Sequence, residues 1–379
     1  MLIAALSLTL AAAGAEEARP ESSRDWMLPA LPESLEALDA HPEDDQSPRQ
    51  FLTLLGREDL ALSRWPKMYT GSDCPAERLM DGDALEALLD ASETAQIIMI
   101  NEAHNQPLHR PFIRDFGLAL AHRGVAVFAA ETFNHEVVSN MAGGHVPERI
   151  GFYTMEGSFA RQVISLREAG YAFVAYETER TEDQSELSWA DRIAIREEDQ
   201  ANHFIERVIE PGSDTRALVH VGHDHLNKRP VAIDEAEIHW FAARLWDKTG
   251  IEPLSIDQTR CASPDGEVRL YSNLDGGMEN GGIDFYVAHP EVTFTEGRPD
   301  WRRETGDVDV PVPDGLTHPG LATVIEARAP DAPLDTLAIE RLLLYPGETL
   351  PLLLPPGEWR LDAFTVDGRH GEAVTVQVE

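Results

Sequence analysis

The sequence predicts an α/β fold, in which a mostly parallel sheet is covered by helices and followed by a small C-terminal all-β domain. Two observations predict it. Apolar runs separated by helix-length segments end abruptly in Glu or His, and such continuous runs are typical of strands buried on both faces. These runs are Gln96–His104, Val125–Glu131, Tyr171–Glu177 and Ala217–His225. After Cys261, shorter runs punctuated by Pro and Gly suggest a sandwich-like β domain.

The N-terminal region has the composition of an export signal and a linker. Leu2–Ala13 is apolar and has the length of a signal-peptide core, and Ala13-Gly14-Ala15 supplies a cleavage pattern. We expect residues 1–15 to be a signal peptide and the protein to be periplasmic or secreted. A mis-assigned start and a buried N-terminal helix are the alternatives. Residues 16–48, rich in Glu, Asp, Pro and Ser, are expected to form a flexible linker.

The remaining chain divides into an α/β domain over residues 49–260 and a β-rich domain over residues 262–379. Short helices are expected within Phe51–Trp65 and at Asp83–Leu89. Proline marks the start of the first connecting helix at Pro107 and Pro111, and Gly124 ends it. Later helices are expected at Ser158–Ala169, Leu187–Ile209 and around Glu235–Lys248. The longer excursion Thr132–Gly157 follows the second strand, where a loop can cover a site.

The expected strands of the β-rich domain are short. They are Val268–Tyr271, Phe285–Ala288, Ala322–Ala327, Leu342–Tyr345, Leu350–Leu354, Trp359–Thr365 and Val374–Val378. The function of this domain cannot be predicted from these runs.

Charge and cysteine content exclude some classes of partner. The chain has 67 Asp and Glu against 31 Lys and Arg, a net charge of −36. A field of that sign repels nucleic acid and anionic membranes, so no nucleic-acid partner is expected. No stretch beyond the N-terminal run is long and apolar enough for an integral membrane span. Cys74 and Cys261 form no zinc motif, and whether they pair stays open.

The ends of the four strands predict one shared site. The carboxyl ends of parallel strands lie at one edge of a sheet, and ligands bind outside that edge. Side chains far apart in sequence are therefore expected to meet there. They are Glu102, His104, Glu131, Glu177, His223 and His225. Charged groups in such a position are tolerated when they are paired, hydrogen-bonded or bound to a metal.

Each candidate has more than one interpretation. Glu102 can orient His104 as a general base, the two can be metal ligands, or they can be a helix cap and a surface histidine. Arg196 can clamp an anionic group of a substrate, pair with the site glutamates, or lie on a solvated helix face. His109 is a substrate-binding candidate or an exposed histidine at a helix start. His220, inside the fourth strand, is expected to be a core histidine.

Several familiar chemistries have no motif in this chain. The sequence contains no Gly-x-Ser-x-Gly elbow, no Walker A or Gly-x-Gly-x-x-Gly loop after a strand, and no His-Glu-x-x-His. A serine α/β-hydrolase, a nucleotide-binding protein and a zincin are therefore not expected.

The strand-end motifs resemble those of a known superfamily. In order and placement, these motifs are similar to those of the erythromycin esterase/ChaN-like superfamily, which includes the TraB/Tiki proteins. The residues that carry the resemblance are Ile100–His104, Glu131, Arg196 and Val221–His225. The resemblance covers roughly residues 95–260, and Asn101 stands where the family usually has glycine. Esterase-like members imply His104 as general base beside Glu102 and Glu131, with His225 stabilising the oxyanion. Tiki-like members imply metal ligands, and ChaN-like members imply haem.

These observations lead to three hypotheses. The first is an exported hydrolase of an ester, lactone or amide, with catalytic His104, Glu102, Glu131 and His225, and with Arg196, Glu177, His223 and His109 binding a small-molecule substrate. In a metal-assisted form, a divalent ion would be held by His104, Glu131 and His225. The second is a haem- or metal-binding protein of iron uptake without turnover. The third is a non-catalytic scaffold led by the β domain. The cofactor stays open between a divalent metal, haem and none.

Overall fold

The computed structural model describes residues 27–30, 47–64, 74–141, 143–178, 184–209, 214–233, 236–276 and 281–379. The expected signal peptide and most of the expected linker lie outside these residues. Within the linker, residues 27–30 are helical, and Met27 and Leu28 are buried. The expectation of a flexible linker is therefore wrong at these residues, because their apolar side chains join a hydrophobic core.

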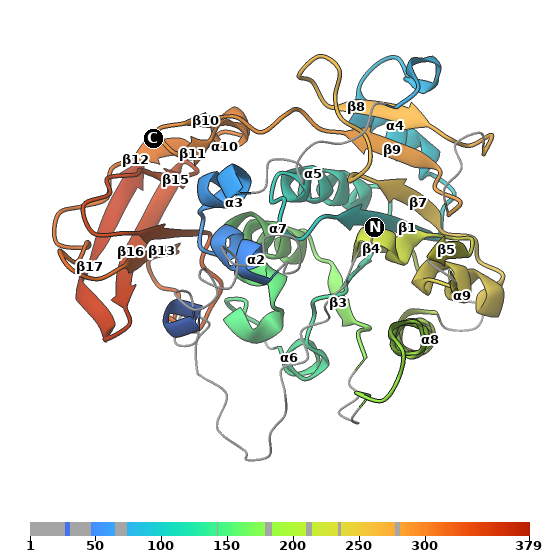
Figure 1. Cartoon of the computed structure of the whole chain (residues 1–379), viewed down its shortest axis with the longest axis horizontal. Coiled ribbons are helices and arrows are strands. Elements are labelled where there is room, and N and C mark those ends of the chain that lie inside the picture. Colours follow the sequence, from blue (N-terminus) through green and yellow to red (C-terminus); the bar gives the residue numbers. More distant parts are fainter. Residues whose placement is uncertain are drawn as a thin grey trace.

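A seven-stranded sheet lies at the centre of the molecule (Figure 1), in the order β3-β2-β4-β1-β7-β9-β8. All neighbouring strands in it are parallel except β8 and β9, which are antiparallel. This arrangement confirms the predicted fold class. The strands are β1 (Ile97–Glu102), β2 (Val127–Ala130), β3 (Ala172–Ala175), β4 (Ala217–Gly222), β7 (Leu254–Asp257), β8 (Arg269–Ser272) and β9 (Phe285–Ala288).

The sheet extends beyond the position at which the sequence changes composition. Strands β8 and β9 correspond to the runs that we assigned to the β-rich domain, yet they pair with the main sheet. The start of the β-rich domain at residue 262 is thus corrected, since the sheet continues to Ala288. Short apolar runs look alike in both settings, and only their pairing partner distinguishes them.

Helices cover both faces of the sheet (Figure 1). Helices α4 (Ala84–Ala91), α5 (His109–Ala121) and α7 (Gly157–Glu168) share one core with Ile98, Phe128 and Leu218. Helices α8 (Trp189–Val208) and α9 (Phe241–Thr249) share the other core with Met99 and Val219. Alternate residues of each strand thus enter opposite cores, which is why the runs are apolar throughout.

Short elements surround the strand ends. The excursion after β2 contains α6 (His135–Asn140) and the 3-10 helices η3 (Glu148–Ile150) and η4 (Tyr153–Met155). The turn after β4 is η5 (His223–Leu226), and a hairpin of β5 (Val231–Ile233) and β6 (Ala236–Ile238) follows it. A further 3-10 helix, η2 (Ala76–Arg78), precedes α4.

The C-terminal region is built from antiparallel strands, as predicted. Its main sheet has the order β14-β13-β16-β17, and a second pair, β12 with β15, shares a hydrophobic core with it. These strands are β12 (Val308–Val310), β13 (Thr323–Arg328), β14 (Glu340–Leu344), β15 (Leu352–Leu354), β16 (Gly357–Thr365) and β17 (Gly368–Val378). The linking segment holds β10 (Phe294–Thr295), β11 (Arg298–Pro299) and α10 (Asp300–Glu304).

Two N-terminal helices pack on this C-terminal sheet, not on the α/β sheet. They are α2 (Ser47–Leu54) and α3 (Glu58–Arg64). Leu52 and Leu55 share a core with Val324 and Leu343. Residues 49–64, which we placed in the α/β domain, therefore cover an apolar face of the C-terminal sheet. That contact joins positions nearly three hundred residues apart, and local periodicity carries no information on it.

Cys74 and Cys261 form a disulfide with their Cα atoms 5.5 Å apart. The bond ties the segment before η2 to the segment after β7. In the described parts of the chain, no helix combines the length and the apolar character needed to cross a membrane.

Candidate functional site

The structure brings the strand-end side chains to one edge of the sheet. Strand β4 lies between β1 and β2, and its register places Gly222 beside Glu102. Along this edge, Glu177 follows β3, Glu131 follows β2, and His223 and His225 follow β4. Glu102 ends β1, and His104 lies in the turn after it. The edge therefore collects residues from more than a hundred positions of sequence.

A buried ion pair orients His104. Its Nδ1 lies 3.0 Å from Glu102 Oε1, and Glu102 also accepts hydrogen bonds from Arg110 Nε (2.7 Å) and Nη2 (2.9 Å). Burial by itself would raise the pKa of Glu102, but the charges of Arg110 and His220 hold that pKa well below its usual range. Glu102 is thus ionised at neutral pH and fixes the proton of His104 on Nδ1.

Arg110 connects this pair to the start of α7. It is fully buried on α5, and its Nη1 donates to Glu156 Oε2 (2.9 Å). Glu156 caps α7 by accepting from the backbone N–H groups of Ser158 and Phe159. The orientation of His104 therefore depends on two helices as well as on its own strand.

His220 is buried in β4, as predicted, and it also contacts the site. Its Nε2 lies 3.1 Å from Glu102 Oε2, and its Nδ1 lies 3.2 Å from Gln162 Nε2. The imidazole stacks on Phe159, with ring centroids 4.6 Å apart. His220 thus supports the carboxylate that orients His104.

A small cavity lies beside His104. Its volume is about 10 Å³, which is room for roughly one water molecule. The Tyr153 ring stacks on His104 at 3.7 Å, and a Cβ on Gly222 would lie 2.5 Å from His104 Nε2. Nε2 therefore faces a position that only glycine leaves open. Residues lining the cavity include Glu102, His104, Glu131, Thr132, Tyr153, Phe159, His220 and Gly222.

Arg196 holds the two strand-end glutamates. Its Nη2 donates to Glu131 Oε1 (2.6 Å), and its Nε lies 3.1 Å from both oxygens of Glu177. Glu131 also accepts from the backbone N–H of Gly222 (2.7 Å). Burial by itself would raise the pKa of Glu131. The charges of His225 and Arg196 lower it by more, so the pKa of Glu131 lies well below its usual range. Of the three interpretations of Arg196, the contacts match pairing with the site glutamates.

His225 lies between two carboxylates. Its Nδ1 is 2.9 Å from Glu197, and its Nε2 is 3.6 Å from Glu131 Oε1. Glu197 is fully buried on α8 and also accepts from the backbone N–H of Phe241 (2.6 Å). Burial would lower the pKa of His225, but Glu197 and Glu131 raise it to about 9. His225 is therefore cationic at neutral pH.

His223 and His109 have different surroundings. The His223 ring meets His104 edge-on, with centroids 5.8 Å apart, and its carbonyl accepts from Asn101 Nδ2 (2.9 Å). Burial and His104 lower the pKa of His223. His109 is buried, does not line the cavity, and accepts from the Ala103 N–H (3.2 Å). Burial and His289 hold the pKa of His109 well below its usual range, so it supports the turn as a neutral group.

The candidate metal ligands do not form a cation site. Among the described residues, no group of three or more His, Cys, Asp or Glu side chains is arranged to hold a metal ion. The guanidinium of Arg196 contacts Glu131 and lies 3.4 Å from His225 Nε2, so a cationic side chain already stands between these donors. His104, Glu131 and His225 do not fit a metal here. The cavity beside them has room for about one water molecule.

Sequence reasoning missed Arg110, Glu156 and Glu197, and it placed Tyr153 only within the covering excursion. Two of these residues carry a detectable signal. Arg110 lies on the helical stripe of Ile113 and Phe116, and Glu197 lies one turn from Ile193 and Ala201. A charged residue on the apolar stripe of a helix is expected to be buried and paired.

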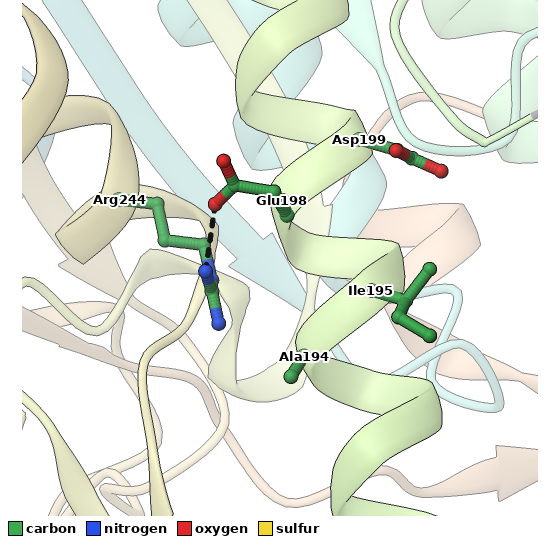
Figure 2. Close-up of a pocket in the computed structure, with 5 residues that line it drawn as sticks. All are labelled: Ala194, Ile195, Glu198, Asp199 and Arg244. Carbon is green, nitrogen blue, oxygen red and sulfur yellow. Dashed lines mark hydrogen bonds and ion pairs between the residues drawn. The ribbon is translucent and has the colours of Figure 1, made fainter. Parts of the chain in front are cut away.

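A larger hollow lies elsewhere on α8 (Figure 2). It has a volume of about 240 Å³ and is lined by Ala194, Ile195, Glu198, Asp199 and Arg244. Arg244 Nη1 donates to Glu198 Oε2 (2.7 Å), the contact drawn in Figure 2. None of the strand-end residues lines this hollow, so it is separate from the site around His104.

Among known structures, the chain is similar to several bacterial effectors and toxins at low sequence identity. No family model matches the chain, and no curated protein does. The type III effector HopBA1 matches with a TM-score of 0.37 and 13% identity, over 59% of this chain and 99% of HopBA1. A structure described as bacterial protein toxins matches at 0.37 and 14%, and RRSP, a MARTX toxin effector domain from Vibrio vulnificus, at 0.32 and 16%. This chain spans 53% and 49% of those two chains.

Proposed function

We propose that this protein hydrolyses an ester, lactone or amide, with His104 as general base. The observation that carries the proposal is that Glu102 contacts His104 Nδ1 while Nε2 lies toward Gly222, and both His104 and Gly222 line a cavity with room for about one water molecule. A neutral imidazole with its proton fixed on Nδ1 has its lone pair on Nε2. Such a group accepts a proton from a water molecule as that water attacks a carbonyl carbon.

The surrounding charges suit each step. The ionised Glu102 stabilises the imidazolium that forms when His104 takes the proton. As the tetrahedral intermediate collapses and its C–O or C–N bond breaks, the imidazolium returns that proton to the leaving alcohol or amine. His225 and Arg196 place positive charge next to Glu131, which lines the cavity, and in this mechanism they offset the repulsion between that carboxylate and the oxyanion of the tetrahedral intermediate. Glu131 and Glu177 hold those cations in place. The resemblance to the erythromycin esterase/ChaN-like superfamily agrees with these roles and remains part of the proposal.

The test is a panel of aryl esters, lactones and amides assayed with the wild-type protein and with His104→Ala and Glu102→Gln. We expect the His104→Ala protein to lose about 10²–10⁴-fold in kcat/KM, as for the removal of a general base. His122→Ala, at the end of α5, is the matched control and should retain full activity. Wild-type turnover that survives in His104→Ala would contradict the proposed mechanism. A wild-type protein inactive on every class would favour the scaffold hypothesis.

We also propose that the protein is exported to the periplasm or secreted. The Cys74–Cys261 disulfide supports this, because such bonds persist in oxidising compartments. Expression of the full chain in a bacterial host, followed by fractionation and intact-mass measurement, tests it. Export predicts a periplasmic or extracellular product that begins after Ala15. A product retained in the cytoplasm with residues 1–15 attached would refute export.

A further inference from the structure

The C-terminal sheet contacts the segment that covers His104. Residues 146–148 pair with residues 335–337 through an isolated bridge and two backbone hydrogen bonds, Glu148 N–H to Asp335 O (2.8 Å) and Leu337 N–H to Val146 O (2.9 Å). The start of α7 lies equally close, since a Cβ on Gly157 would be 2.8 Å from Ile339 O. Both ends of the segment Val146–Gly157 are therefore fixed by the C-terminal region.

One side chain of β14 holds the middle of this segment. Arg341 is buried, and its Nη2 donates to Glu148 Oε1 (2.6 Å) while its Nη1 donates to Met155 O (2.9 Å). Its Nε donates to Glu326 Oε1 (2.8 Å) of the neighbouring strand β13. The planar guanidinium thus spans both 3-10 helices, η3 and η4, from a fixed position in the sheet.

Tyr153 lies between the two points that Arg341 holds. Its backbone N–H donates to Thr132 Oγ1 (2.9 Å), next to Glu131, and its ring covers the face of His104 at 3.7 Å with the planes only 12° apart. Met155, two residues later, packs in the core that Val324, Leu343 and Phe364 form with the N-terminal helices. The position of the Tyr153 ring is therefore set jointly by the α/β core, in which Tyr153 and Ile150 pack, and by the C-terminal region through Arg341 and Met155.

We propose that Arg341 is a positioning residue of the His104 site, which acts from the C-terminal sheet by holding Tyr153 over the imidazole. On this proposal the β-rich region is a working part of the site and not an independent scaffold. The inference rests on the proposed function only in treating His104 as the reacting group. The coupling between Arg341 and His104 can be measured without any substrate.

The test measures how fast diethyl pyrocarbonate modifies His104 in the full-length protein, with the labelled peptide identified by mass spectrometry. Arg341→Lys keeps the charge beside Glu326 but cannot reach Glu148 and Met155 O together. In this variant we expect the reagent to modify His104 roughly tenfold faster than in the wild type, which is the factor for one lost charge-assisted hydrogen bond. Tyr153→Leu should label equally fast, and Tyr153→Phe, which keeps the ring, should stay slow.

The matched control is Arg298→Lys. Arg298 is also a buried arginine of the C-terminal region, but it contacts Gly56 O and Glu340 and not the segment Val146–Gly157. In Arg298→Lys, the reagent should modify His104 at the wild-type rate. Glu148→Gln, which weakens the same contact from the other side, should match Arg341→Lys and decides the matter if that protein does not fold.

Two results would overturn the inference. One is wild-type labelling of His104 in both Arg341→Lys and Glu148→Gln. The other is an equal rise in Arg298→Lys, which would show general loosening. The failure of the hydrolase proposal gives a different result, namely no turnover on any substrate while these labelling differences remain. Turnover with unchanged labelling would remove only the role of Arg341.

Discussion

His225 stands between Glu197 and Glu131, and its ionisation links the site to pH. Its pKa is raised to about 9, so the folded state keeps a proton that an unfolded chain releases near pH 6.5. A raised pKa adds stability that is complete below the unfolded value and disappears as pH rises through the folded value. The same proton supplies the positive charge that the proposed mechanism uses.

We therefore expect the free energy of unfolding to decrease between about pH 6.5 and pH 9, by roughly 3 kcal/mol from this group. Urea unfolding at several pH values measures it. In Glu197→Gln the pKa of His225 should be lower, and the decrease should be smaller and lie at lower pH. An identical pH dependence in His225→Gln and the wild type would show that His225 is not the group responsible.

Gly222 controls the space beside His104. Its backbone has φ −86°, which any residue adopts, so an added methyl group acts through contact alone. That methyl carbon would lie 2.5 Å from His104 Nε2 and 3.0 Å from Glu131 Oε2. We expect Gly222→Ala to displace His104 and to lower kcat/KM by about 10²-fold, the cost of a misplaced catalytic group.

Assays of turnover and of thermal unfolding separate the two effects of this substitution. The added methyl group overpacks the site and should lower the free energy of unfolding by about 1–3 kcal/mol, which leaves the protein folded, so a larger loss of activity would report on the displaced His104. Gly143→Ala is the control, since a Cβ there meets no atom within 4 Å, and it should leave both measurements unchanged. Full activity of Gly222→Ala would show that His104 does not need this space.

At the scale of the elements, helix α5 carries Arg110, whose positive charge compensates the buried carboxylates of the site. Arg110 neutralises Glu102 and contacts Glu156, and none of the three is accessible to water to any useful extent. Removing one partner of a buried ion pair leaves an uncompensated charge, which costs more than the pair itself gained.

Arg110→Leu should accordingly lower the free energy of unfolding by about 3–5 kcal/mol. Arg114→Leu, one turn later on α5 and partly exposed beside Asp115, should cost less than about 1 kcal/mol. Chemical denaturation of both proteins provides the comparison. Equal losses in the two variants would mean that helix propensity, and not the buried pair, sets the stability.

The elements also show how far sequence reasoning reaches. The strands β1 to β4 could be predicted because each is apolar on both faces and ends at a charged residue, and their shared edge follows from parallel pairing. The six strand-end residues, from Glu102 on the first strand to His225 after the fourth, were predicted in this way. Arg110 and Glu197 were missed because they lie within helices, where only their place on an apolar stripe reveals them. The packing of α2 on the C-terminal sheet depends on contacts between distant segments, which no local pattern records.

At the scale of the whole molecule, the Cys74–Cys261 disulfide closes a loop that covers about half of the chain. Cys74 and Cys261 are 187 positions apart, and the loop between them contains β1 to β4 and all the strand-end residues. A cross-link of this kind stabilises mainly by restricting the unfolded chain.

We expect Cys74→Ser/Cys261→Ser to lose about 2–5 kcal/mol of stability, and the wild type to lose a similar amount in a reductant. Calorimetry with and without reductant measures both. The double variant should itself be insensitive to the reductant, which serves as the control. An unchanged transition temperature in the reduced wild type would show that the bond contributes nothing to the stability of the folded chain.

The strand order determines when this site can be completed during synthesis. Strands β1 and β2 are made first, but they do not pair with each other, and β4, which begins at Ala217, fills the position between them later in synthesis. The contacts that position the Tyr153 ring are complete only after β14 has been made, and this strand begins at Glu340, about a tenth of the chain from its end. A ribosome-bound chain that has not reached this strand lacks the arginine that fixes the cover of His104. The site, with its cover in place over His104, is thus complete only late in synthesis, when almost the whole polypeptide has been made.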